Sequence, residues 1–326
     1  MDEKIENVAC NSCDVICEYK DRNGEIPPSV LQYSLAPTLS LSAGGVRYHI
    51  VMSKNGGEKI IHIESDSDIE LLTMLSVLND AFRFNNLFEG CFYHYTSCVT
   101  KGEEYIYKLR PLLLSYFESI ERYAQIGIYL SDNESQRVCC NLVKYLDETE
   151  IIHPVFLYST FTNGMAVDLR MALLLEVFEP LSEKLVNSSI VQIPEVQRSY
   201  SSTCPHCNKP ISRTVKQKPT LAEKLRAIID KFGQTIFQGE DIDIIISKAV
   251  KTRNRIDHVI VDEKMKRKVF SGPECGFYLH KFSLLYRYLI LSGLGVDQKD
   301  LDAAVHAATK SLNGQFPQCR IIHSGA

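Results

Sequence analysis

Three side chains within a six-residue segment carry the functional groups needed for phosphodiester chemistry. Arg253, Asn254 and His258 stand in the sequence Arg-Asn-Arg-Ile-Asp-His. A guanidinium can hold a phosphate through two hydrogen bonds and stabilise charge that develops on it. An imidazole can exchange a proton near neutral pH, and an asparagine can orient either group. Such a set needs no metal ion or other cofactor to cleave a phosphodiester.

The same residues also have a purely structural interpretation. Arg253 could pair with a neighbouring acid, and His258 could end a helix, where a cation interacts favourably with the helix dipole. Several basic residues lie near the motif in the sequence: Lys248, Lys251, Arg255, Lys264, Lys266, Arg267 and Lys268. They could form a small basic binding site or simply a solvated surface. The net charge of the whole chain is −4, which argues against a broad basic surface for sequence-independent nucleic-acid binding.

The elements that position the motif are predicted to be helices. Apolar residues recur at three- and four-residue spacing over residues 112–123, 135–146, 165–177, 242–258 and 277–291. Pro180 is expected to kink or end the third of these helices. Thr220 and Glu223 form a capping box that opens another helix, and Gly233 is placed to end it. The motif therefore lies at the end of the helix predicted over residues 242–258.

The first part of the chain is predicted to be rich in strands. Residues 48–52 and 59–63 favour strands, and Asn55-Gly56-Gly57 between them favours a hairpin turn. Residues 67–70 match a capping box that would open a helix, and further strands are predicted at 91–95 and 104–109. We predict an α+β chain with a strand-rich domain over residues 1–110 and a helical domain over 111–326.

The predicted helical domain contains one long segment of little periodicity, residues 188–220. We interpret it as a Cys-containing insertion, because loops of this length are usually functional or disordered.

The setting of the motif among these helices resembles the HEPN superfamily, specifically its ApeA-like group. The motif of that group is Arg, then Asn, Asp or His, then three residues and His, and Arg253, Asn254 and His258 match it. The resemblance covers about residues 150–295 and implies an all-α bundle with metal-independent ribonuclease activity. Arg253 would bind the scissile phosphate, His258 would transfer the proton and Asn254 would position one of them. Such proteins generally act as dimers in which two motifs face each other.

Helix geometry separates two of the three motif residues. Each residue turns about 100° on a helix, so Arg253 and His258 point about 140° apart, whereas Asn254 and His258 share one stripe. A straight helix therefore does not aim Arg253 and His258 at one phosphate. The last turn could unwind, the long Arg253 side chain could reach round, or a second protomer could complete the site.

Two Cys-x-x-Cys pairs have the spacing of zinc ligands. They are Cys10 with Cys13 and Cys204 with Cys207, among eleven cysteines in total. We predict a structural zinc, bound either by all four thiolates or by Cys204 and Cys207 of two copies across a dimer. The alternative is free thiols. The first residues of the chain lack the pattern of a secretory signal, and no apolar stretch is long enough to span a membrane. We therefore expect a cytoplasmic protein with reduced cysteines.

The favoured hypothesis is a homodimeric endoribonuclease that acts on RNA, as a toxin or anti-phage effector controlled by a phage or antitoxin protein. The alternative is a non-catalytic HEPN module that binds nucleotide, RNA or a protein partner. A third hypothesis is a zinc-bridged assembly protein. His280 and Glu176 are weaker site candidates. Glu176 is either an acid lining the cleft or a polar position on an amphipathic helix.

Overall fold

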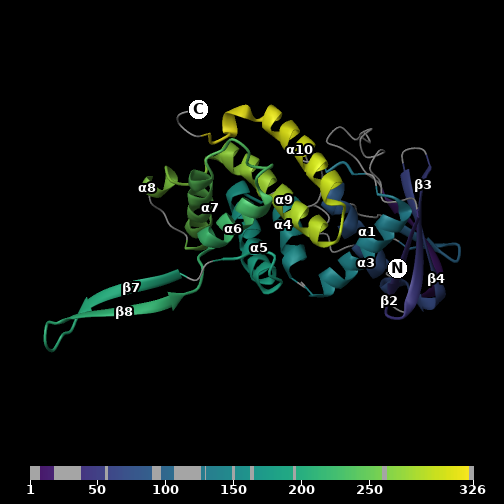
Figure 1. Cartoon of the computed structure of the whole chain (residues 1–326). Coiled ribbons are helices and arrows are strands. Elements are labelled where there is room, and N and C mark those ends of the chain that lie inside the picture. The colour runs from purple at the N-terminus through teal and green to yellow at the C-terminus, as the bar shows by residue number, and fades with distance from the viewer. Residues whose placement is uncertain are drawn as a thin grey trace.

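The computed structural model describes residues 8–17, 38–55, 58–89, 97–105, 126–128, 130–148, 151–161, 165–193, 196–258 and 263–322. An antiparallel sheet near the N-terminus is followed by a body of helices, and the two lie side by side in an elongated molecule (Figure 1). The predicted α+β class is therefore confirmed.

The sheet has the strand order β2-β3-β4-β1-β5-β6, with neighbouring strands antiparallel. Its strands are β1 (Ala9–Cys17), β2 (Thr38–Ala43), β3 (Val46–Asn55), β4 (Glu58–Glu70), β5 (Ser97–Thr100) and β6 (Glu103–Tyr105). The pairing of β3 with β4 confirms the predicted hairpin. The glycines of this hairpin lie outside the described residues. So do the strand predicted at 91–95 and the last residues of the strand predicted at 104–109. One face of the sheet is buried, through side chains such as Val15, Ile50 and Ile61.

The capping box predicted at residues 67–70 is wrong, because these residues extend β4. Ile69 and Glu70 pair with Cys10 and Ala9 of β1, so a partner distant in sequence outweighs the local helix signal. The helix α1 (Leu71–Glu89) begins directly after the strand. Together with α3 (Asp132–Glu148), it lies between the sheet and the helical body (Figure 1).

The helical body is built around α9 (Gly272–Gly293), which is buried on almost every side from Phe277 to Leu291. A helix that is apolar all round belongs in the centre of a bundle. Around it lie α4 (Ile152–Phe161), α5 (Val167–Asn187), α6 (Leu221–Phe232), α7 (Ile242–Asp257), α8 (Glu263–Lys266), α10 (Gln298–Gln315) and a short 3-10 helix, Pro317–Cys319. The helices predicted over 135–146, 242–258 and 277–291 are confirmed. That predicted over 112–123 lies outside the described residues.

The helix α5 is longer than predicted, because it continues through Pro180 to Asn187. Phe178 and Leu181 are buried on either side of the exposed Pro180, so the apolar stripe of the helix is continuous across it. This packing holds the helix together where the proline removes one backbone hydrogen bond.

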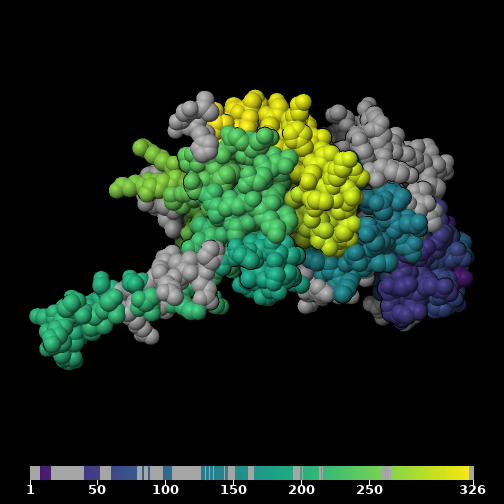
Figure 2. All heavy atoms as spheres, in the orientation of Figure 1, coloured from purple at the N-terminus to yellow at the C-terminus, as the bar shows by residue number. Residues whose placement is uncertain are grey.

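Residues 188–220 do not form the predicted loop. They contain β7 (Val196–Thr203) and β8 (Pro210–Gln217), an antiparallel hairpin that projects from the helical body at the end opposite the sheet (Figures 1 and 2). We call residues 196–218 the arm. The sequence gives no strand signal there, because a hairpin with no buried face needs no alternation of apolar and polar residues.

In the part of the chain that the structure describes, no helix is both long and apolar enough to cross a membrane.

Candidate functional site

The motif occupies the C-terminal turn of α7. The helix is capped at its start by Asp241, whose carboxylate accepts from the Ile244 N–H at 3.1 Å. Ile245, Ile246 and Ala249 are buried and fix its inner face. His258 is the C-cap residue, and its N–H donates to the carbonyl of Asn254 at 3.1 Å. The last turn is therefore regular and does not unwind.

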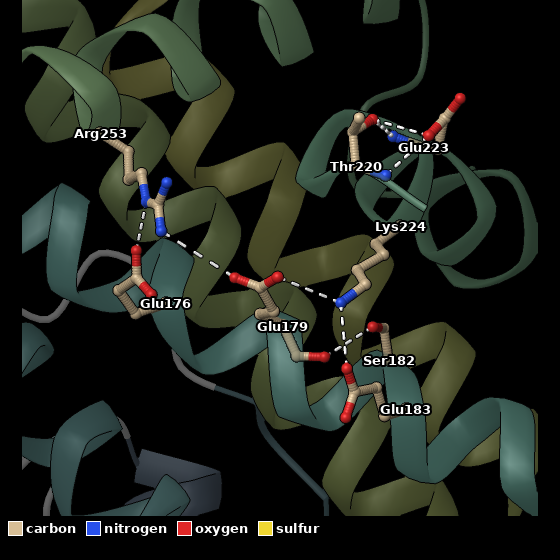
Figure 3. A network of polar contacts seen from close by, with 8 residues as sticks. All are labelled: Glu176, Glu179, Ser182, Glu183, Thr220, Glu223, Lys224 and Arg253. Atoms are coloured by element: carbon tan, nitrogen blue, oxygen red, sulfur yellow. Dashed lines mark hydrogen bonds and ion pairs between the residues drawn. The ribbon is translucent and has the colours of Figure 1, made fainter. Parts of the chain in front are cut away.

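Arg253 turns towards α5 and is held there by carboxylates (Figure 3). Its Nε pairs with Glu176 and, at 2.6 Å, with Asp257, and one terminal nitrogen lies 3.9 Å from Glu179. The hydrogen bond to Glu176 raises the pKa of Arg253, so the guanidinium is held in its charged form. About a quarter of the side chain, 24%, is exposed, so a ligand can still reach it.

The carboxylates around Arg253 belong to a longer row of charges (Figure 3). The buried Lys224 of α6 lies 3.2 Å from Glu179 and 3.3 Å from Glu183, so Glu179 links the Arg253 and Lys224 side chains. The row ties α5, α6 and α7 together at the level of the motif. A buried lysine needs such partners, since an unpaired charge in the interior is costly.

From the sequence, Glu176 was either an acid lining the cleft or a polar position on an amphipathic helix. Glu179, Glu183 and Lys224 were not predicted. In the structure the Glu176 carboxylate contacts Arg253, but Glu176 does not line the groove beside Asn254. A signal was present: Glu176, Glu179 and Glu183 stand three and four residues apart and so share one face of an otherwise apolar helix.

Asn254 lies on the other side of α7 and lines a groove of about 1190 Å³ between α6 and α7. Ala227, Ile246 and Val250 give this groove an apolar lining. Its charges are mixed, with the basic residues Arg226, Lys231 and Lys251 and the acidic residues Glu223, Asp230 and Asp243. The Asn254 side chain also accepts a hydrogen bond from Arg253 at 3.2 Å. Asn254 thus connects the groove to the guanidinium.

Arg253 and His258 do not meet within one chain. His258 is exposed at the end of α7, and among the described residues no hydrogen bond or ion pair joins it to Arg253. The last turn is regular, so it does not unwind to bring the two side chains together. Arg253 points to α5, so its side chain does not reach round to His258 either. The weaker candidate His280 lies on α9, where burial and the charges of Arg170 and Arg287 lower its pKa to about 4.

The two Cys-x-x-Cys pairs lie at opposite ends of the molecule (Figure 1). Cys10 and Cys13 are buried in β1 of the sheet, whereas Cys204 and Cys207 lie at the tip of the arm. The prediction that all four thiolates bind one zinc within a chain is therefore wrong, because the arm projects away from the sheet. Across the described ranges no cluster of three or more His, Cys, Asp or Glu side chains is arranged for a metal.

The tip of the arm is a tight turn closed by backbone hydrogen bonds. The Cys204 N–H donates to the Lys209 carbonyl and the Asn208 N–H to the Cys204 carbonyl, both at 2.9 Å. Asn208 adopts a φ of 52°, which closes the turn. Backbone N–H groups of His206 and Cys207 hydrogen bond to the Cys204 sulfur and lower its pKa. The turn therefore favours the thiolate, the form that binds a metal.

Comparison with protein families agrees with the motif. Residues 174–300 match the family model described as Apea-like HEPN, a stretch that runs from the middle of α5 through α9 and includes Arg253, Asn254 and His258. The chain therefore contains an ApeA-like HEPN domain. No curated protein and no solved structure matches the chain.

Proposed function

We propose that the protein is a metal-independent endoribonuclease. The observation that carries this proposal is the arrangement at the end of α7: a charged, partly exposed Arg253 contacts Asn254, which in turn lines an open groove. His258 lies one turn beyond Asn254, on the same stripe of the helix. The HEPN match over this segment supports a nuclease or defence module.

The reaction would be a transfer of the phosphoryl group within the RNA strand. A neutral His258 would take the proton from a ribose 2′-OH, and the 2′-oxygen would attack the adjacent phosphorus. The bond to the 5′-oxygen would break, and that oxygen would receive a proton. Arg253 would stabilise the charge on the non-bridging oxygens. The products would be a 2′,3′-cyclic phosphate and a 5′-hydroxyl.

This reaction needs a base and an acid, and one His258 supplies one of them. A second protomer would bring a second His258 as well as a second Arg253. We therefore propose a dimer with both motifs at one cleft, in agreement with the separation of Arg253 and His258 within a chain.

The test is cleavage of single-stranded RNA in excess EDTA. Arg253→Ala and His258→Ala should each reduce the rate by at least about 100-fold, the usual scale for removing an acid–base or charge-stabilising group. Arg255→Ala on the same helix and His306→Ala on α10 are matched controls that should retain activity. Thermal unfolding of all four variants should resemble that of the wild type. Undiminished cleavage by Arg253→Ala and His258→Ala would refute the proposal.

The alternative function is a non-catalytic module that binds nucleotide, RNA or a protein partner. One observation favours it: Arg253 is already paired with carboxylates of Glu176 and Asp257, with which a phosphate must compete. Wild-type protein that binds RNA tightly yet leaves every RNA intact would support this function.

We further propose that the activity serves as a toxin or an anti-phage defence in the cytoplasm, released or restrained by a phage or antitoxin protein. The HEPN match supports a defence context. Expression of the wild type should arrest growth or limit phage yield, whereas His258→Ala expressed at the same level should do neither. Equal phenotypes for the two proteins would contradict this role.

A further inference from the structure

The arm has a charge opposite to that of the rest of the chain. Residues 196–218 carry five basic residues and no acidic one: Arg198, Lys209, Arg213, Lys216 and Lys218. The whole chain has 36 basic and 40 acidic residues, which leaves 31 basic against 40 acidic outside the arm. A surface that only needs to be solvated usually mixes both signs. The arm is therefore a projecting element with charged residues of one sign.

The arm presents its side chains to solvent. Its described side chains are exposed, apart from the half-buried Cys204 and Gln217. Many carry hydroxyl groups: Ser199, Ser201, Ser202, Thr203, Ser212 and Thr214. Lysine, arginine, serine and threonine are the side chains that commonly contact nucleic-acid phosphates. A protein partner would instead favour an aromatic or aliphatic centre in the contact surface. The arm exposes one described large aliphatic side chain, Ile211, among many polar ones.

The base of the arm is fixed to the helical body. On the N-terminal side, the Lys231 ammonium donates to the carbonyl of Ile190. On the C-terminal side, Thr220 caps α6, and its N–H donates to the Glu223 carboxylate at 2.7 Å. An isolated two-stranded hairpin is only marginally stable in water, so a ligand along its length would stabilise it.

The groove beside Asn254 is also lined by the segment that precedes the arm in the chain. The groove that Asn254 lines on α7 also includes Ser189, Ile190, Val191 and Gln192, which lead into the arm. Each strand of the arm has eight residues and is therefore about 26 Å long. A strand of RNA bound at Asn254 can continue through the groove and along the arm.

We propose that the arm binds the sugar–phosphate backbone of single-stranded RNA and delivers the strand to the groove beside Asn254. This inference rests on the proposed ribonuclease function. It adds a binding element outside the HEPN motif and explains how a chain with a net charge of −4 can attract RNA.

The experiment measures RNA binding without cleavage, in full-length protein carrying His258→Ala. Fluorescence anisotropy of a labelled single-stranded RNA gives the Kd at several salt concentrations. The arm variant adds Lys209→Gln, Arg213→Gln and Lys218→Gln. The matched control adds Lys144→Gln, Lys299→Gln and Lys310→Gln, three exposed lysines of α3 and α10. Circular dichroism and unfolding curves check that both variants fold.

The arm variant should raise the Kd at least about 10-fold, and the slope of log affinity against log salt should fall by about 0.7 for each lost phosphate contact. The control should stay within about twofold of the parent. Equal affinity of the arm variant and the parent would overturn the proposal, and so would an unchanged salt slope. A charge reversal, Lys209→Glu with Lys218→Glu, should weaken binding further.

The two proposals can fail separately. Arm-dependent RNA binding by a wild type that cleaves no RNA would refute the ribonuclease and leave the arm's role intact. RNA cleavage with arm-independent binding would refute the arm's role alone. Loss of a bound acidic protein from the arm variant, with RNA affinity unchanged, would reassign the arm to a protein partner and overturn this inference.

Discussion

The Arg253 guanidinium is held in place by carboxylates and must still be able to bind a phosphate. Glu176 and Asp257 both contact the guanidinium at its Nε, and the terminal nitrogens carry its other N–H groups. An arginine has five N–H donors in a fork, so it can keep one carboxylate while it turns others towards a phosphate. Positioning and substrate binding can therefore share the same side chain.

A second residue, His153 on α4, has a consequence for stability at low pH. It is fully buried, and its ring lies 3.0 Å from the Tyr286 hydroxyl. Burial and the nearby Arg83 lower its pKa from 6.5 to about 3. The folded protein therefore keeps this ring neutral, whereas the unfolded chain binds a proton below about pH 6.5.

As pH falls from 6.5 towards 3, the extra proton favours the unfolded state, and each pH unit costs up to about 1.4 kcal/mol. We predict that His153→Gln flattens the fall of the urea midpoint between pH 7 and pH 4. His306→Gln, at an exposed position on α10, should keep the wild-type slope. An identical slope for His153→Gln would show that another group controls acid unfolding.

At the scale of elements, α7 places two residues of the motif against two different helices, α5 and α6. Its regular last turn directs Arg253 to α5 and leaves Asn254 in the groove beside α6. Residues 189–192, between α5 and the arm, line the same groove. The chain order α5, arm, α6, α7 thus places Asn254 of the motif and the segment that leads into the basic hairpin beside one groove.

The tip of the arm offers two thiol groups, those of Cys204 and Cys207. We propose that Cys204 and Cys207 bind a structural zinc together with the same pair of a second protomer, since four-coordinate zinc needs two further ligands. Metal analysis should find about one zinc for every two chains, and Cys204→Ser should abolish it. The unfolding midpoint of the helical body should change little, because the arm projects from it.

Cys140→Ser is the matched control, because Cys140 is an exposed cysteine on α3. It should retain the metal. Purified protein without zinc, or with the same zinc content after Cys204→Ser, would contradict the proposed site.

At the scale of the whole molecule, the sheet and the arm occupy opposite ends, with the motif in the helical body between them (Figures 1 and 2). This shape leaves the end of α7 accessible to a second copy. It also separates the sheet from the groove that would receive RNA.

The proposed dimer predicts complementation between two inactive proteins. Light scattering should give a mass near twice the 37.0 kDa of one chain. After subunit exchange, a mixture of Arg253→Ala and His258→Ala should recover a small part of the activity, because the mixed dimer keeps one Arg253 and one His258 at the shared cleft, whereas each parent dimer lacks one of these groups entirely.

Each variant incubated alone under the same exchange conditions is the control and should stay inactive. An active monomer at the assay concentration would exclude a shared site. A mixture as inactive as its parts would show that each chain must supply both residues.

Much of the fold could be predicted from local patterns. Capping and periodicity predicted α6, with Thr220 and Gly233 at its ends, and also α7 and α9. The hairpin β3–β4 followed from strand formers around a glycine turn. These features depend on residues within one or two turns of each other, and those interactions are present in the sequence itself.

The sequence by itself determined which groups the motif offers and that Arg253 and His258 diverge on a helix. Only the tertiary structure decided that three carboxylates lie beside Arg253. It also decided that residues 67–70 pair as part of a strand, that the arm forms, and that the two cysteine pairs are far apart. Each of these depends on contacts between residues far apart in the chain. Local propensity does not encode such contacts, because their energy exists only once the distant partner is in place.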